Sequence, residues 1–185
     1  LKSCIQTRGV KVETLPTFDI EFLFLHIRGK SVGEELEVSL IAPDDGVTAV
    51  PVKINIDDIK IKREEEHDKQ IKLDDNLMME MKYPSLEQFI KNNFDFDDDA
   101  SIDKSFEVIA SCIDKIYNEE EVWSTSDCTK KELMDFLDQM NTMQFKLIEK
   151  FFETMPKLAH TVKLKNPETK VESEVVIEGL ASFFG

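Results

Sequence analysis

An apolar run from Phe18 to Ile27, within LPTFDIEFLFLHIRGKSVGEE (residues 15–35), most constrains how this chain folds. The run predicts a helix with apolar side chains on almost every side, so other elements or a partner chain must enclose it. At about ten residues it is too short to span a bilayer. Thr17 is placed to cap the helix and Gly29 to end it. We therefore expect a buried helix that stops at a charged, glycine-containing corner, residues 28–34.

The corner contains Gly29-Lys30-Ser31, which looks like the end of a phosphate-binding loop. That loop requires a glycine at the position of Phe24, and its lysine opens a helix instead of following one. Nucleotide binding is therefore not predicted from these residues.

The charge of the chain limits the class of its partners. The 185 residues include 23 Lys and Arg against 38 Asp and Glu, a formal net charge of −15. Such a surface repels phosphate backbones and anionic lipid, so we expect neither nucleic acid nor a membrane as a partner. The length suffices for one domain or two small ones, and a hydrophobic content of 41% argues against global disorder.

Three widely spaced cysteines, Cys4, Cys112 and Cys128, indicate a reducing compartment and no disulfide framework. Cys112 lies on an apolar helical face and is expected to be buried. The sequence shows no secretory signal or membrane-spanning segment, so a soluble cytosolic protein is expected. Because Leu1 is not a methionine and residues 1–5 read as the end of a helix, we expect the native chain to begin earlier.

The hydrophobic periodicity predicts an α+β fold that combines small antiparallel β-hairpins with a helical, bundle-like segment and a C-terminal β-hairpin. Four regions follow from it: an N-terminal helical segment (1–33), an antiparallel β region (34–83), a helical region (84–158) and a C-terminal hairpin with a Phe-Phe tail (159–185). In the helical region we expect a short helix from Leu86, a long one from Ser101 through Tyr117, and two more that begin after Thr129 and at Asn141.

Charges along the C-terminal hairpin favour its pairing, because Lys163 and Lys165 would face Glu172 and Glu174 on the opposite strand. The run from Lys62 to Lys69 has no apolar residue and is expected to be a solvated loop.

The acidic run Asp95–Asp99 places carboxylates at the first, third and fifth positions of a calcium loop. That loop requires a glycine at the position of Ala100 and a glutamate at the position of Phe106. We therefore interpret the run as a solvated acidic linker and predict no metal site there.

Histidines give little support to an enzyme. His26, His67 and His160 have no cysteine or carboxylate beside them at the spacing of metal ligands. His67 is expected at the surface and His26 in a hydrogen-bonded packing role. No catalytic motif is present, so no catalytic, cofactor or metal residue is predicted. The alternative that stays open is a small hydrolase that uses acidic residues or Cys128 with His160.

Two surfaces are candidates for contact with a partner protein. The first is the charged corner, with Arg28, Lys30 and Glu34. The second is the aromatic region of Phe145 and Phe152, taken together with the C-terminal pair Phe183 and Phe184. Either the two terminal phenylalanines fold back on the core or they are presented to a partner. For each of these residues a place in the core is an equally good expectation.

Four separated blocks occur in order along nearly the whole chain: LPTFDIEFLFLHIRGKSVGEE, MKYPS (81–85), KELMDFLDQM with FFETMPKL (131–158), and EGLASFF (178–184). In these blocks the sequence resembles the baseplate hub protein family of T-even bacteriophages. The resemblance implies a non-enzymatic hub component, or a hub assembly chaperone, that acts while the contractile-tail baseplate is built. It also implies a native N-terminal extension, and other hub and tail proteins as partners. It places the protein in the host cytoplasm during assembly, or in the virion baseplate.

The resemblance extends to the turns of the two hairpins, where some relatives carry Cys-x-x-Cys knuckles. This chain has Ala42-Pro43-Asp44-Asp45 at the first turn and Asn166-Pro167-Glu168-Thr169 at the second. Without thiolates these turns lack the usual zinc ligands, so packing and turn chemistry must hold them. Besides the hydrolase, an adaptor that binds a host protein stays open as a third reading.

Overall fold

The computed structural model describes residue 1 and residues 3–88 and 102–183. Its fold is α+β with antiparallel sheets and a C-terminal hairpin, as predicted. The chain divides into two compact units. Unit 1 comprises Leu1–Val12, Phe18–Arg63 and Pro156–Gly185, and unit 2 comprises Glu13–Thr17 and Glu64–Met155. Each unit draws on several of the four sequence regions, and the region 34–83 contributes to both.

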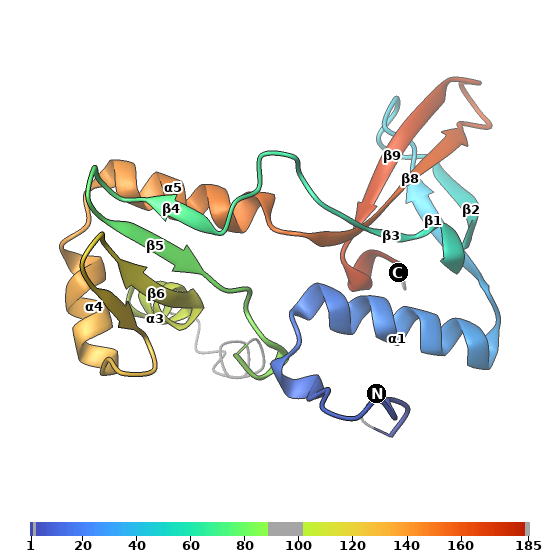
Figure 1. The fold of residues 1–185 in the computed structure, drawn as a ribbon. Coiled ribbons are helices and arrows are strands. Elements are labelled where there is room, and N and C mark those ends of the chain that lie inside the picture. The colour runs from blue at the N-terminus through green and yellow to red at the C-terminus, as the bar shows by residue number, and fades with distance from the viewer. Residues whose placement is uncertain (2, 89–101, 184–185) are drawn as a thin grey trace. The chain divides into compact units, whose positions relative to one another are not determined.

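Unit 1 is built from two hairpins and one long helix, α1 (Thr17–Val32), as Figure 1 shows. Strands β1 (Glu35–Ile41) and β2 (Ala49–Asn55) form the first hairpin. Strands β3 (Lys60–Lys62), β8 (Lys157–Lys165) and β9 (Glu172–Glu178) form an antiparallel sheet in the order β3-β8-β9. The short 3-10 helices are η1 (Val12–Thr14), η2 (Ile56–Asp58) and η3 (Leu180–Phe183).

The core of unit 1 lies between α1 and the hairpins. Both hairpins form where the alternation of apolar residues predicts them, and each turns one apolar face inward. The buried residues of this core are Leu25, Leu36, Val38, Ile54, Ile56, Ile59, Leu158, Val162, Ile177 and Phe183.

Helix α1 continues past Gly29, where the sequence predicted its end. Gly29 is buried inside the helix, and a Cβ atom there would lie 2.8 Å from Ile56 Cδ1. Gly33 ends the helix instead: it has a φ of +137°, and its N–H donates to the Gly29 carbonyl at 3.0 Å. The predicted corner is therefore wrong, and residues 28–32 form the last turn of α1. The sequence could not separate a glycine needed for close packing from one needed for a helix end.

Unit 2 contains a four-stranded antiparallel sheet in chain order: β4 (Gln70–Lys72), β5 (Met78–Met81), β6 (Ile113–Tyr117) and β7 (Val122–Ser124). Helices α3 (Ile102–Cys112), α4 (Lys130–Asp138) and α5 (Thr142–Thr154) contribute to a core shared with this sheet. The buried residues of the core are Ile71, Leu73, Met79, Met81, Ala110, Cys112, Ile113, Ile116, Leu137, Ile148 and Phe151.

Strand β6 corrects the predicted long helix, which ends at Cys112 instead of continuing to Tyr117. Ile113 and Ile116 are three residues apart, which suits one face of a helix but opposite faces of a regular strand. In the structure Met81 pairs with Ile113 and Glu80 with Lys115, so one extra residue, Asp114, forms an irregularity in the ladder. This bulge lets both isoleucines reach the core, where they are 0% and 8% exposed.

Helices α4 and α5 begin where the sequence predicts them, after Thr129 and at Asn141. The Thr129 side chain accepts a hydrogen bond from the Glu132 N–H, and the Glu132 carboxylate accepts one from the Thr129 N–H at 2.7 Å. Asn141 forms the same reciprocal box with Gln144 at the start of α5. The helix expected from Leu86 begins at that residue, and its continuation lies outside the described residues, as does the acidic run 95–99.

No helix in the described part of the chain is both long and apolar enough to span a membrane.

Candidate partner-binding surfaces

The charged residues predicted to meet a partner lie at the end of α1. Arg28 and Lys30 are in its last turn, and Glu34 follows Gly33. Lys30 and Glu34 form an exposed ion pair across one helical turn, and the Lys30 ammonium donates to the Glu34 carboxylate. This hydrogen bond raises the pKa of Lys30 above its ordinary value. Arg28 is half-buried on the same turn. Lys30 and Glu34 therefore offset each other's charge at this exposed position.

Phe145 and Phe152 lie on α5, partly buried against the core of unit 2. The Phe145 ring meets the edge of Phe106, with centroids 5.4 Å apart, and Phe152 meets Phe151 at 5.2 Å. Both rings also line an open groove of about 550 Å³ beside α5. The structure therefore gives each ring a packing role and an accessible edge.

Phe183 is the last residue of η3. It is 1% exposed and packs in the core of unit 1. It therefore folds back, as in the first of the two alternatives for the terminal pair. This burial leaves Phe183 no accessible surface for a partner in this arrangement. Phe184 lies outside the described residues, and Phe145 and Phe152 belong to the other unit.

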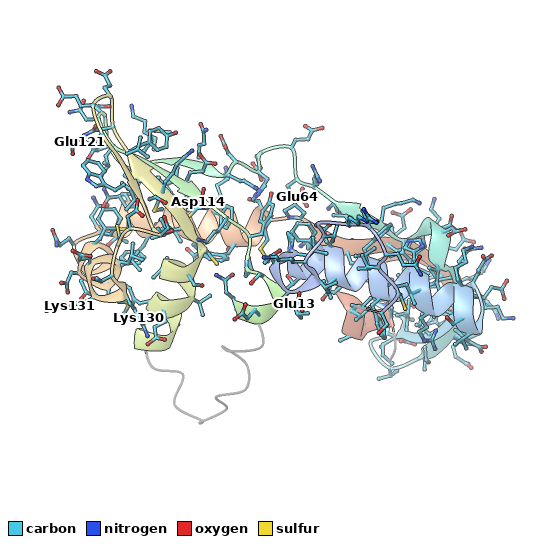
Figure 2. The ribbon with its side chains drawn as sticks, turned by 60° about the horizontal axis from the view of Figure 1, so that its bottom comes forward. Glu13, Glu64, Asp114, Glu121, Lys130 and Lys131 are labelled. Atoms are coloured by element: carbon cyan, nitrogen blue, oxygen red, sulfur yellow. The ribbon has the colours of Figure 1, made fainter. Side chains whose placement is uncertain are left out.

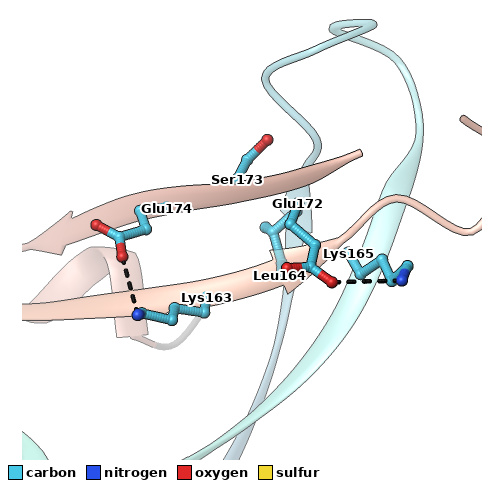
Figure 3. Close-up of a pocket in the computed structure, with 6 residues that line it drawn as sticks. All are labelled: Lys163, Leu164, Lys165, Glu172, Ser173 and Glu174. Atoms are coloured by element: carbon cyan, nitrogen blue, oxygen red, sulfur yellow. Dashed lines mark hydrogen bonds and ion pairs between the residues drawn. The ribbon is translucent and has the colours of Figure 1, made fainter. Parts of the chain in front are cut away.

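The C-terminal hairpin carries the expected cross-strand charges. Lys163 pairs with Glu174 at 3.2 Å and Lys165 with Glu172 at 3.3 Å, and Figure 3 shows both ion pairs on the two strands. These residues line a shallow, open hollow of about 400 Å³. The paired charges satisfy one another, so the hollow presents no unbalanced charge for a ligand.

The turns of the two hairpins in unit 1 meet through a polar junction that the sequence did not reveal. Asn166 is fully buried, and its amide nitrogen lies 3.1 Å from Asp44 Oδ1 and 2.9 Å from Asp45 Oδ2, donating to both carboxylates. Its oxygen accepts from the Glu168 N–H at 2.9 Å. The Thr169 hydroxyl donates to Asp44. We call Asp44, Asp45, Asn166 and Thr169 the Asn166 junction, and its hydrogen bonds join the turns of the two hairpins.

His67 is not the surface residue expected from the charged run 62–69. Its ring is half-buried, with Nδ1 2.9 Å from Thr154 Oγ1 and Nε2 2.9 Å from the Tyr83 hydroxyl. The Thr154 hydroxyl donates to a carbonyl of its own helix, so it accepts from Nδ1–H and the Tyr83 hydroxyl donates to Nε2. The ring centroid also lies 5.3 Å from that of Phe151. His67 therefore anchors an otherwise exposed loop, a role that no local sequence signal indicated.

The remaining histidines and cysteines make local contacts or lie in different units. The His26 ring packs against Phe22 at a tilt of 57°, with centroids 4.2 Å apart, and its Nδ1 lies 3.7 Å from Asp57 Oδ1. Its buried Nε2 has no hydrogen-bond partner among the described residues, so His26 has the expected packing contact without the expected hydrogen bond. Cys112 is fully buried, as expected. Cys128 belongs to unit 2 and His160 to unit 1. The described residues include no group of three or more His, Cys, Asp or Glu side chains placed to hold a metal ion.

Displaced pKa values in the described chain have local structural causes. Burial raises the pKa of Asp19, of Glu21 and of the Cys112 thiol. Hydrogen bonds from the capping threonine of α4 lower the pKa of Glu132. Hydrogen bonds within the first hairpin turn and from Asn166 lower the pKa of Asp45. Asp19 and Glu21 lie on α1, Cys112 on α3, Glu132 in the first turn of α4 and Asp45 in the turn of the first hairpin, so each pKa shift is explained by burial or hydrogen bonds at its own position.

Comparison with known proteins connects the whole chain to one family. The family described as T4 bacteriophage base plate protein matches residues 1–185. Searches of curated proteins and of solved structures found no match. The match spans both units and every block on which the resemblance was based. The chain therefore belongs to the T4 bacteriophage base plate protein family.

Proposed function

We propose that this chain is a non-enzymatic component of the phage baseplate hub, or a chaperone of hub assembly, and that it acts through contacts with other baseplate proteins. The observation that carries the proposal is the family match over residues 1–185, which leaves no part of the chain outside a baseplate family. A baseplate is a protein assembly, so a member of this family has other baseplate proteins as its natural partners.

The described side chains support a role without catalysis. A catalytic site requires titratable groups that converge on one pocket. The carboxyl groups with displaced pKa values are those of a helix cap, a hairpin turn and two half-buried positions on α1.

The charge of the chain supports protein partners over nucleic acid or a membrane. With a formal net charge of −15, the chain repels phosphate groups and anionic headgroups at long range. The same charge keeps an assembly component from associating with its own copies before it meets its partner.

Affinity purification from infected cells tests this function. The tagged full-length chain is expressed in host cells infected with the phage that encodes it, and bound proteins are identified by mass spectrometry. We expect baseplate proteins to be enriched over a purification with the tag on an unrelated acidic protein of similar size. Recovery of no tail protein would overturn the proposal.

Purified phage particles separate the two forms of the proposal. A hub component remains in the finished particle at a fixed ratio to other baseplate proteins. A chaperone is recovered from infected cells with baseplate proteins but is absent from particles. Quantitative mass spectrometry of both fractions from the same infection measures this difference directly.

A further inference from the structure

An apolar groove lies at the edge of the unit 2 sheet, beside β7, and none of the candidate partner-binding residues in the described part of the chain lines it. The groove has a volume of about 330 Å³ and lies between this edge and α4. Apolar side chains line most of it: Leu77, Ile116, Trp123, Leu133 and Phe136. We call it the Trp123 groove. Trp123 is 40% exposed and its neighbour Val122 is 64% exposed. Both are large hydrophobic side chains, so this edge of the sheet presents apolar surface to solvent.

The backbone of β7 is open along the same edge. In the described sheet, β7 pairs only with β6. The Asn118 N–H donates to the Glu121 carbonyl at 3.0 Å, so these two residues form a hydrogen-bonded pair. Hydrogen-bonded and non-hydrogen-bonded pairs alternate along an antiparallel ladder. The next pair, Tyr117 with Val122, is therefore not hydrogen-bonded, and the pair after it, Ile116 with Trp123, is. Trp123 therefore turns its N–H and C=O toward Ile116, whereas Val122 and Ser124 turn theirs to the open side. An added strand would find backbone partners there and place alternate side chains in the Trp123 groove.

Two acidic turns adjoin the groove at one end. Lys72, Met78, Tyr117 and Val122 are consecutive partners across the four strands, so the β4–β5 and β6–β7 turns lie at the same end of the sheet. These turns carry Asp74, Asp75 and the exposed residues Glu119 to Glu121.

The two lysines at the start of α4, Lys130 and Lys131, lie away from those turns (Figure 2). Figure 2 shows Glu121 at the tip of the β6–β7 turn, and Lys130 and Lys131 at the start of α4, far from that tip. Lys72, which pairs with Asp75 at 2.9 Å, offsets only part of the negative charge at the turns. The end of the groove beside the turns is therefore negative and complements a basic occupant.

We propose that the Trp123 groove binds an extended segment of a partner protein, in which aliphatic side chains at alternate positions follow one or more Lys or Arg residues. The segment adds as a strand to β7, its aliphatic side chains fill the groove over Trp123, and its basic residues lie beside the acidic turns. This inference deepens the proposed function and rests on it for the presence of a protein partner.

Trp123 itself reports occupation, because it is the only tryptophan of the chain. The probe is a synthetic peptide, Lys-Lys-Val-Thr-Leu-Thr-Val with blocked ends, titrated into the purified full-length chain. We expect a saturable shift of the tryptophan emission to shorter wavelength as the groove loses water. The acidic peptide Glu-Glu-Val-Thr-Leu-Thr-Val keeps the aliphatic residues and should bind at least about fivefold more weakly.

Two further comparisons separate the parts of the proposal. Glu120→Gln with Glu121→Gln should weaken binding of the basic peptide by about twofold to fivefold. The matched control, Glu149→Gln with Glu153→Gln on the exposed side of α5, changes the net charge equally and should leave binding unchanged. The basic peptide with a methylated backbone keeps every side chain but cannot donate to β7, and it should not bind.

Three results would overturn the proposal: no shift with the basic peptide, equal binding of the acidic peptide, or unchanged binding after backbone methylation. A shift that grows with protein concentration in the absence of peptide would identify a second copy of this chain as the occupant instead. The titration needs only the purified chain, so its failure leaves the proposed function standing. Recovery of no tail protein from infected cells would remove the proposed function even where the peptide binds.

Discussion

Gly29 shows how one residue decides the packing of α1. A glycine within a helix lowers helix stability by about 1 kcal/mol relative to alanine. Gly29 nevertheless lies inside α1, three residues before its last residue, Val32. A Cβ atom at this position would lie 2.8 Å from Ile56 Cδ1, and Ile56 is only 1% exposed. The helix therefore gives up intrinsic stability for close contact with η2.

We expect Gly29→Ala to lower the free energy of unfolding by up to about 2 kcal/mol. The overpacking, about 1–3 kcal/mol, outweighs the gain in helix propensity, about 1 kcal/mol. Ile56→Val removes the clashing methyl group and should cost less in the Gly29→Ala background than in the wild-type chain. Urea unfolding of the wild-type chain, the two single variants and the double variant measures this coupling. If the two changes in the free energy of unfolding simply add, residues 29 and 56 do not interact in this way.

Phe183 is a core residue of unit 1, so its substitution tests packing and not contact with a partner. Phe183→Ala should lower the free energy of unfolding by about 3–5 kcal/mol, as for other large aromatic residues in a core. Val176→Ala, at a 51% exposed position on β9, serves as the control and should cost less than about 1 kcal/mol. A small effect of Phe183→Ala in urea unfolding would show that η3 is not part of the core in solution.

Individual elements differ in how far their own residues define them. The helix starts near Thr129 and Asn141 and the alternation in the hairpins are local patterns, and the structure confirms each of them. The capping box at Asn141 is a further local contact that the structure adds. Strand β6 is different, because Ile113 and Ile116 fit a helical period as well as a bulged strand. Pairing with β5 and β7 decides between them, and that pairing depends on residues more than 30 positions away for β5.

The Asn166 junction, which joins the two hairpin turns, predicts that the stability of the fold depends on pH. The pKa of Asp45 is held below its ordinary 3.8 by hydrogen bonds from the Thr48 hydroxyl and N–H, the Val47 N–H and Asn166. A lowered folded-state pKa means that the ionised carboxylate stabilises the fold. This contribution is complete above the unfolded-state pKa and is lost as the pH falls through the lowered folded-state value.

We therefore expect Asp45→Asn to be less stable than the wild-type chain near pH 7, with a difference that narrows below about pH 3.8. Asp135→Asn, on the exposed side of α4, is the matched control and should show a smaller difference at every pH. Urea midpoints measured from near pH 7 to near pH 2 test this. A difference that widens on acidification would contradict the assigned direction of the pKa shift.

At the scale of the whole molecule, charge is the dominant long-range property. A formal net charge of −15 opposes compaction by self-repulsion, whereas the exposed ion pairs contribute little individually. Added salt screens both effects, and the excess of negative charge decides the sign. The chain should therefore be more stable in salt that shortens the screening length to below about 10 Å.

We expect the midpoint of urea unfolding to rise between about 0.02 M and about 0.5 M NaCl, where the screening length falls from above 10 Å to below it. The same measurement near pH 4, where many carboxylates are protonated, should show a smaller rise because the net charge is smaller. An unchanged or falling midpoint near pH 7 would show that attractive ion pairs outweigh the self-repulsion.

The amino-acid sequence alone predicts the α+β class, both hairpins, the charge pairs of the C-terminal hairpin, the starts of α4 and α5, and the family resemblance. These features depend on local periodicity, caps and turns, or on blocks that keep their order along the chain. The packing role of Gly29, the bulge in β6, and the buried or half-buried contacts of Asn166, His67 and Phe183 become visible only in the folded chain. Each of these depends on a partner distant in sequence, whose position follows from the packing of the whole unit and not from neighbouring residues.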